Sequence, residues 1–306
     1  MRLSSAIKTL SDLAGRVKSS GKIKKVVVVM GQDPNTLEAL SKATTEGFIS
    51  PILIGDPSQI LLLLPEFGLN KNQCLIIDET NPAKAAELGV KLVRDGDGDI
   101  LMKGLIGTDV FLKAVLNKEY GLMLPKGVLS YVCAIEIDKY SKLLFITDPA
   151  VIPFPDLKQK AAMAKYVIEM AHKFGIDKPK VALMGASEKM NAGFPNSVDY
   201  AVLCKMAQRK QLPECIMDGP MDLFLACDPQ SVEIKGIETP VNGEADVLLF
   251  PTIEACNPFY KSLMLFGGGE LAGLIQGTTH PVVVMSRSES ALSKYYCLAM
   301  ACLTCE

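Results

Sequence analysis

The sequence predicts an α/β protein built on a mainly parallel sheet. Short apolar runs rich in Val, Ile and Leu alternate with longer segments of helical periodicity along the 306 residues. Residues 26–30 (VVVVM) form such a run, and residues 34–48 (PNTLEALSKATTEGF) form the helical segment after it. Uninterrupted apolar runs are typical of strands that helices cover on both faces of a sheet. Runs and helices in alternation place the chain in the α/β class.

The same pattern continues along the chain. Residues 128–137 (VLSYVCAIEI) and 142–148 (KLLFITD) are expected to form a paired β segment. The other expected strands are residues 49–55, 74–78, 100–104, 180–185, 215–219, 247–251 and 282–286, with helices between them that include 81–96 and 108–121.

A proline-rich window suggests a division into two domains. Residues 148–160 (DPAVIPFPDLKQK) hold three prolines that interrupt the periodicity, and a long helical pattern follows. We expect a first α/β domain formed by residues 1–151 with 279–306, and a second formed by residues 152–278.

Composition excludes several classes of function. The net charge is −2 and the basic residues are scattered, so we expect no nucleic-acid partner. No apolar stretch reaches the roughly 18 residues of a membrane span, and the amphipathic N-terminus lacks the apolar core of a secretory signal. The nine cysteines are irregularly spaced, and several lie in apolar runs. This usage is typical of reduced thiols in a cytoplasmic protein.

Familiar anion and metal motifs are missing or incomplete. The phosphate-loop pattern does not occur, and residues 267–273 (GGGELAG) only approach a dinucleotide-binding pattern. Residues 95–99 (DGDGD) lack the glycine and glutamate that a calcium loop needs, and the two histidines are far apart. We therefore expect no metal site.

Polar and basic residues do follow four of the expected strands. In parallel sheets the ligand crevice lies at the carboxyl ends of the strands, so these groups are expected along one crevice. Each one alone also has an ordinary explanation as a helix cap or a solvated end. The groups are Lys103-Gly104 with Thr108, Asp218-Gly219-Pro220, Glu254 with Asn257, Tyr260 and Lys261, and Ser286-Arg287-Ser288.

These segments resemble the phosphate acetyltransferase/phosphate butyryltransferase family, and the chain looks closer to the butyryl branch. The most specific are residues 235–263 (KGIETPVNGEADVLLFPTIEACNPFYKSL) and 282–294 (VVVMSRSESALSK), in which Asn-x-x-Tyr-Lys follows a strand and Ser-Arg-Ser follows another. Residues 101–116, the two segments from 129 to 150, and 218–223 also carry the resemblance, which covers nearly the whole chain.

The resemblance implies a fold, a reaction and a set of partners. The fold is a two-domain, three-layer sandwich like that of isocitrate and isopropylmalate dehydrogenases, with a cleft between the domains. The reaction is reversible transfer of a short acyl group, butyryl or similar, between coenzyme A and inorganic phosphate. Acyl-CoA, phosphate and acyl phosphate are then the substrates and products, coenzyme A is a substrate and not a permanently bound cofactor, and the protein is expected to be a homodimer.

The resemblance also assigns roles to residues. The serine and arginine of the Ser-Arg-Ser turn suit a phosphate at a helix N-terminus, and an asparagine amide suits a developing oxyanion. Ser293 occupies the position at which the acetyl branch has a candidate base. The expected catalytic residues are Ser286, Arg287, Asn257, Lys261 and Ser293. The expected substrate-binding residues are Lys103, Gly104, Thr108, Lys113, Ser130, Asp218, Glu254, Tyr260 and Ser288.

Several positions depart from the family pattern. Cys256 stands in place of a glycine, Tyr131 in place of a histidine, Phe224 in place of an aspartate, and Ser293 in place of the candidate base. These changes leave open a paralogue that binds coenzyme A or anions with altered or no catalysis. A metal- and NAD-dependent dehydrogenase of the same fold is a further alternative, but it needs clustered aspartates for a divalent ion, and no Asp-x-x-x-Asp group occurs on a candidate site helix.

Overall fold

A computed structural model describes residues 6–286 and 289–305. The chain forms two compact units, and each combines strands and helices as the sequence predicts. Unit 1 comprises Ser130–Glu270 with the described part of Met1–Thr9, and unit 2 comprises Leu10–Leu129 with Leu271–Glu306. The described chain therefore starts in unit 1, passes to unit 2 at Leu10, returns to unit 1 at Ser130 and finishes in unit 2.

Unit 2 is built on strands in the order β3-β2-β1-β4-β11-β10. All neighbours in this order pair in parallel except β10 and β11, which are antiparallel. The valines of the central strand β1 are fully buried, which explains its continuous apolar sequence. The strands are β1 (Lys24–Val29), β2 (Ile49–Gly55), β3 (Leu75–Asp78), β4 (Ile100–Lys103), β10 (Glu270–Gln276) and β11 (Val282–Val283).

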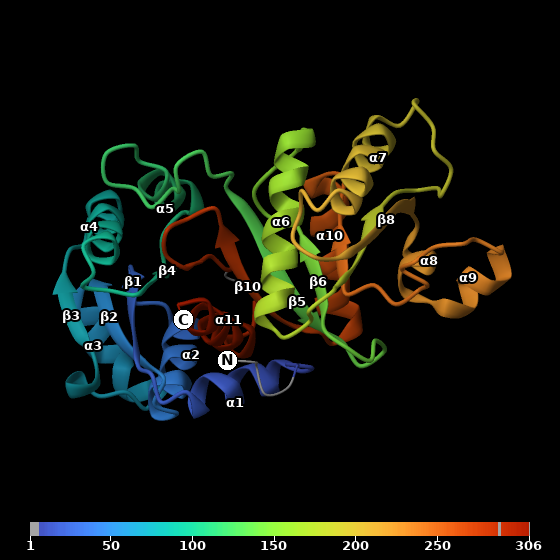
Figure 1. The fold of residues 1–306 in the computed structure, drawn as a ribbon. Helices are drawn as coiled ribbons and strands as arrows, with labels where there is room; N and C mark the ends of the chain where they lie inside the picture. Colours follow the sequence, from blue (N-terminus) through green and yellow to red (C-terminus); the bar gives the residue numbers. More distant parts are fainter. Residues whose placement is uncertain (1–5, 287–288, 306) are drawn as a thin grey trace. The chain divides into compact units, whose positions relative to one another are not determined.

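Helices of unit 2 lie above and below these strands in Figure 1, with α4 and α5 on one side and α1, α2 and α11 on the other. Two of them begin with a proline after an Asx residue whose side chain caps the helix, Asp56 for α3 and Asn81 for α4. The helices are α1 (Leu10–Ser19), α2 (Pro34–Thr45), α3 (Pro57–Leu63), α4 (Pro82–Arg94), α5 (Thr108–Val115) and α11 (Ala291–Thr304), with short 3₁₀ turns η1 (Leu64–Phe67) and η2 (Lys71–Gln73).

Unit 1 is built on strands in the order β5-β6-β9-β7-β8, and only the β5–β6 pair is antiparallel. The long helix α6 packs on β5, β6 and β9, and α7 packs on β8 (Figure 1). The strands are β5 (Ser130–Glu136), β6 (Leu144–Thr147), β7 (Lys180–Met184), β8 (Ile216–Met221) and β9 (Val247–Leu249). The helices are α6 (Leu157–Lys173), α7 (Pro195–Gln208), α8 (Leu223–Cys227), α9 (Pro229–Lys235) and α10 (Ile253–Gly267).

Several predictions made from the sequence are confirmed. The paired β segment is the β5–β6 pair, and the helix after the prolines is α6, which begins with a capping box of Asp156 and Gln159. All nine cysteines are free. Strand β10 was not predicted, because its sequence ELAGLIQ follows three glycines and contains a fourth.

The units divide the chain at different places from the predicted domains. Unit 1 begins at Ser130 and not at residue 152, because β6 pairs with β9 and brings the β5–β6 pair with it. The return to unit 2 occurs at Leu271 and not at residue 279, because β10 pairs with β11. The division into two domains, residues 1–151 with 279–306 and residues 152–278, stays a prediction.

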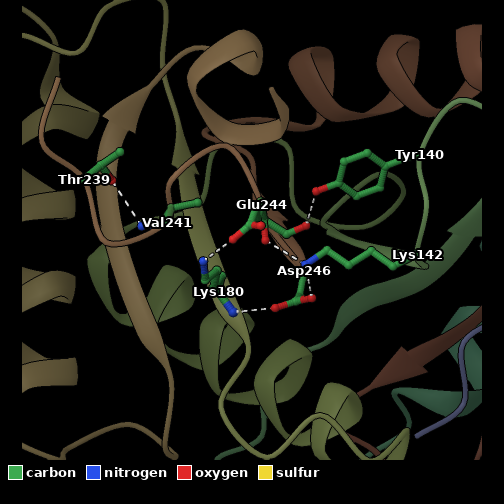
Figure 2. A network of polar contacts seen from close by, with 8 residues as sticks. Tyr140, Lys142, Lys180, Thr239, Val241, Glu244 and Asp246 are labelled. Atoms are coloured by element: carbon green, nitrogen blue, oxygen red, sulfur yellow. Dashed lines mark hydrogen bonds and ion pairs between the residues drawn. The ribbon is translucent and has the colours of Figure 1, made fainter. Parts of the chain in front are cut away.

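The amino ends of the unit 1 strands carry a closed network of charges (Figure 2). Lys142, just before β6, donates from Nζ to an Asp246 carboxylate oxygen at 2.6 Å, and Asp246 precedes β9. Its other oxygen accepts the backbone N–H of Lys180, at the start of β7, at 2.8 Å. The Lys180 ammonium in turn donates to Glu244 at 2.7 Å. These contacts link the starts of three neighbouring strands, β6, β9 and β7.

Among the described residues, we find no helix with both the length and the apolarity that crossing a membrane requires.

Candidate functional site

In unit 2, two of the predicted site segments end side by side. Strands β4 and β11 pair in parallel, with Val283 opposite Met102. Lys103 is the last residue of β4, and Ser286 lies three residues beyond Val283, so both follow the carboxyl ends of neighbouring strands. Lys103 is only 7% exposed, and its ammonium lies 3.4 Å from the Gly104 carbonyl oxygen. A nearly buried cation at this edge is suited to an anionic ligand.

The Ser286 turn leads into a firmly anchored helix. The Ser286 N–H donates to a Glu289 carboxylate oxygen at 2.6 Å, and the Ser290 hydroxyl caps α11 by accepting the Ser293 N–H at 2.9 Å. Lys294 in the first turn forms a buried ion pair with Asp33 at 3.0 Å, and Asp33 directly precedes α2. Arg287 and Ser288, the centre of the predicted phosphate turn, lie outside the described residues.

Ser293, which stands at the position of the candidate base, forms a hydrogen bond within the fold. Ser293 is 2% exposed, and its hydroxyl accepts the N–H of Leu271 in β10 at 3.1 Å. This bond joins α11 to the neighbouring strand. A part for Ser293 in the reaction stays a prediction.

The remaining predicted residues of unit 2 lie after β4. Gly104 passes so close to the loop after β1 that a Cβ there would lie 2.3 Å from the Met30 carbonyl oxygen. Only glycine allows this approach. Thr108 begins α5 at the surface, and Lys113 is exposed in its last turn.

In unit 1, helix α10 presents most of the predicted residues. The Asn257 side-chain amide donates to the Pro149 carbonyl oxygen at 2.8 Å, which fixes its orientation at the end of β6. An amide nitrogen carries two N–H groups, so this bond leaves a second donor. Glu254 and Lys261 are exposed on the helix, and Tyr260 is buried.

A second polar cluster lies beside Asn257 at the same edge of the sheet. Ser130 begins β5, and its hydroxyl lies 3.4 Å from that of Thr147 at the end of β6. Asp148 follows, and its buried carboxylate accepts the backbone N–H groups of Ala150, Val151 and Ile152 at 2.9, 2.9 and 3.2 Å. Burial raises the pKa of Asp148, although the N–H bonds and the Ser130 hydroxyl act in the opposite direction.

Asp218 lies within β8, apart from this cluster. Its carboxylate accepts the Thr239 hydroxyl at 2.6 Å, and it borders a hollow that Glu188 and Glu238 also line. Three carboxylates around one hollow do not favour a phosphate there.

The comparisons with known proteins cover nearly the whole chain. The family model described as "Phosphate acetyl/butaryl transferase" matches residues 76–302. This chain belongs to that family. It is 39% identical to a phosphate butyryltransferase of Clostridium acetobutylicum over 97% of this chain and 98% of that protein. It is 36% identical to a phosphate acetyltransferase of Thermotoga maritima over 92% of this chain and 95% of that one.

A solved structure agrees with the fold. A branched-chain phosphotransacylase from Enterococcus faecalis matches with a TM-score of 0.80 and 31% identity, over 92% of this chain and 99% of that one. The recognition of the family from the sequence is therefore confirmed.

The departures from the family pattern have plain structural consequences in this member. Cys256 is fully buried, and burial raises the pKa of its thiol well above the usual value, as is typical of a core cysteine. Tyr131 is buried in β5, and Phe224 is 69% exposed on α8. Among the described residues, no three His, Cys, Asp or Glu side chains are grouped so as to hold a metal ion.

The structure thus gathers the predicted residues of this family member into two sets, one in each unit. Unit 2 holds Lys103, Gly104, Thr108, Lys113, Ser286 and Ser293, and unit 1 holds Ser130, Asp218, Glu254, Asn257, Tyr260 and Lys261. Sequence reasoning missed Asp148, Asp33 and Lys294, which position these sets. The Asp-Pro pair after a strand at 33–34 and 148–149 was the available signal.

Proposed function

We propose that this protein is a phosphate acyltransferase that moves a short acyl group reversibly between coenzyme A and inorganic phosphate. Family membership over nearly the full chain supports this proposal. The observation that carries it is the parallel pairing of β4 and β11, because Lys103 and the Ser286 turn then follow neighbouring strands. A dehydrogenase of the same fold is not favoured.

The reaction needs a positioned nucleophile and a stabilised oxyanion. A phosphate oxygen attacks the thioester carbonyl carbon and forms the new C–O bond. The carbonyl oxygen becomes negatively charged, then the C–S bond breaks and the sulfur leaves as a thiolate that takes up a proton. The products are acyl phosphate and free coenzyme A. No covalent bond to the protein is required, so positioning and electrostatic stabilisation supply the catalysis.

Unit 2 supplies the phosphate site in this proposal. The Lys103 ammonium, the Ser286 and Ser288 hydroxyls and the Arg287 guanidinium hold the phosphate oxygens at the approach to α11. An arginine holds two phosphate oxygens at once, which a lysine does not. The Lys294–Asp33 ion pair positions the beginning of α11. Gly104, Thr108 and Lys113 complete this set of phosphate-site residues. Ser293, in the first turn of α11, acts at the position where the acetyl branch has its candidate base.

Unit 1 supplies the acyl-CoA side. The second amide N–H of Asn257 stabilises the oxyanion, and Lys261 attracts the phosphates of coenzyme A. Ser130, Asp218, Glu254 and Tyr260 line the path of the substrate. We further propose that the two units are the domains of a dehydrogenase-like three-layer sandwich with the substrate cleft between them. A homodimer in the cytoplasm, with coenzyme A as a substrate and no permanent cofactor, completes the proposal.

The decisive test is release of coenzyme A thiol from butyryl-CoA and acetyl-CoA, with and without phosphate. We expect release that depends on phosphate, and we expect Arg287→Ala to reduce kcat/KM at least about a hundredfold, because a charged donor to phosphate is lost. Arg209→Ala, at the exposed end of α7, is the matched control and should match the wild type. Folded protein that binds coenzyme A but releases no thiol would support a non-catalytic paralogue instead.

A further inference from the structure

Unit 1 contains a hollow that none of the assignments above uses. It has a volume of about 200 Å³ and opens where β7 and β9 end. Its walls include Met184 and Gly185 at the end of β7, Tyr200 of α7, and Pro251 just after β9. This is the carboxyl edge of the parallel strands, where α/β proteins bind ligands.

The interior offers apolar surface and few polar atoms. Tyr200 borders the hollow and is 1% exposed, and its hydroxyl is already engaged, because it donates to the Met184 carbonyl oxygen at 2.9 Å. The Ser197 hydroxyl accepts the Asn191 N–H at 3.1 Å. Proline and methionine side chains form much of the remaining wall. An apolar ligand suits such a lining, because a polar one would lose its bonds to water.

Apart from the buried Ser197, the polar residues of the lining are more accessible to solvent. Ser187, Lys189 and Asn196 border the hollow, and each is exposed or half-buried. An apolar interior with a polar rim is suited to a ligand that is apolar at one end and polar at the other.

The hollow opens at strand ends next to that of the candidate site, because β9 pairs with both β7 and β6, and the Asn257 amide binds the Pro149 carbonyl just after β6. Pro251 is followed by Thr252, the cap of α10, and α10 carries Glu254 and Asn257. Pro220, another wall residue, comes two positions after Asp218. For a ligand whose polar end meets Asn257 at the end of β6, the hollow therefore lies at the ends of the next strands in the sheet, β9 and β7.

The size of the hollow limits the ligand. An engineered cavity of roughly 150 Å³ lined by apolar side chains is enough to take up benzene. A hollow of about 200 Å³ therefore has room for a chain of four to six carbons, straight or branched, and not for a long fatty acyl chain.

We propose that this hollow binds the acyl chain of the substrate and sets the chain-length preference. This inference rests on the proposed phosphate acyltransferase function and extends it by naming the residues that select the acyl group. Phe194, which directly precedes α7, borders the hollow and is 54% exposed, so a smaller side chain at this position would widen the hollow.

Two kinds of variant test this assignment. Asn196→Leu and Ser187→Leu place apolar bulk at the rim, whereas Phe194→Ala removes bulk from the wall. The matched controls are Ala201→Leu and Val198→Ala, which change exposed positions on the same helix that do not border the hollow. The measurement is kcat/KM of phosphate-dependent thiol release for acetyl-, butyryl- and hexanoyl-CoA.

We expect the leucine variants to lower the butyryl-to-acetyl ratio of kcat/KM at least about tenfold, since even one methylene changes such ratios by this much. Phe194→Ala should raise the hexanoyl-to-butyryl ratio several-fold, and the controls should keep wild-type ratios. Equal losses for all three substrates would overturn the assignment. A higher KM for free coenzyme A with unchanged ratios would also overturn it, because the hollow would then hold the pantetheine arm.

Binding separates this inference from the proposed function. If the wild type releases no thiol from any acyl-CoA, the catalytic proposal fails and calorimetric titration still tests the hollow. Tighter binding of butyryl-CoA than of acetyl-CoA, lost in Asn196→Leu and kept in Ala201→Leu, would support it. Binding that is equal for all chain lengths, or absent, would overturn it.

Discussion

The two edges of the unit 1 strands use polar residues in opposite ways. At the amino edge, Lys142, Lys180, Glu244 and Asp246 pair with one another in the network of Figure 2. At the carboxyl edge, the buried carboxylate of Asp148 is held by backbone N–H groups, and no lysine or arginine among the described residues forms an ion pair with it.

The difference separates residues that stabilise the fold from residues that remain available to a ligand. At the amino edge, the charged side chains form ion pairs and hydrogen bonds with one another. At the carboxyl edge, Asn257 donates one amide N–H to the Pro149 carbonyl and has another to donate, and an apolar hollow opens at the ends of β7 and β9. Substitutions at the amino edge should therefore affect stability alone, and those at the carboxyl edge should also affect catalysis.

Asp148→Ala should have the largest effect on stability. It leaves three backbone N–H groups without their acceptor in a buried place, and each such loss costs about 1–3 kcal/mol. We expect a loss of about 3–5 kcal/mol in the free energy of unfolding, measured by urea denaturation. A loss below about 1 kcal/mol would mean that water replaces the carboxylate.

Asp148→Asn is the matched control and also tests the pH dependence. The amide oxygen still accepts the N–H groups of Ala150 and Val151, so most of the stability should remain. Burial raises the pKa of Asp148 in the folded protein, so its contribution to stability is fully present below the unfolded pKa of about 3.9 and is lost as the pH rises through the folded pKa. Stability of the asparagine variant should lack that decline.

Asn257→Ala should have the next largest effect, and on catalysis. Loss of one oxyanion donor lowers kcat about 10²- to 10³-fold, or roughly 3–4 kcal/mol in activation free energy. Phosphate-dependent thiol release measures it, and Ser262→Ala, exposed on the same helix, is the control. A variant with unchanged kcat but lower stability would show that Asn257 only stabilises the loop at Pro149. Its role would then resemble that of the amino-edge residues, which stabilise the starts of their strands.

Asp246→Ala should destabilise the protein without slowing the reaction. It breaks the bond from the Lys142 ammonium and leaves the Lys180 N–H without its acceptor, at a cost of about 2–3 kcal/mol. Denaturation measures the loss, and kcat at a temperature where the variant is folded should stay within about twofold of the wild type. A larger change in kcat would contradict the expectation that substitutions at the amino edge affect stability alone.

The sequence predicted the strands and helices well where periodicity decides them. The valines of β1 and the cap, Asp156, before α6 are local signals, and the structure confirms both elements. Strand β10 was not predicted because its glycines hide the pattern, although it pairs with β11 only a few residues further along the chain, with Ile275 opposite Val282. The start of unit 1 at Ser130 depends on the pairing of β6 with β9, about a hundred residues further along the chain, which no local signal in the sequence records.

The candidate site was predictable only in part. The polar ends of β4 and β11 were visible because apolar runs stop there, and resemblance to the family gave them roles. The hollow was not predictable, because Met184, Tyr200 and Pro251 come from three separate elements and none is unusual alone. Nor was the pairing of Lys294 with Asp33, which lie 261 residues apart.

Glu244→Gln should have the smallest effect of the set and sharpens the comparison within the amino edge itself. The Glu244 carboxylate meets the Lys180 ammonium at the surface, where water and salt weaken ion pairs. The hydrogen bond and charge of Lys180 lower the pKa of Glu244, so its contribution to stability is present above the unfolded pKa and is lost as the pH falls through the folded pKa.

The Glu244→Gln variant and the wild type should therefore differ slightly in free energy of unfolding at neutral pH and low salt, and should coincide in acid or at high salt. Urea denaturation at both pH values and both salt concentrations measures this, with Asp246→Ala as the reference. A difference as large as that of Asp246→Ala would mean that the outer pair, and not the buried Asp246, holds the three strand starts together.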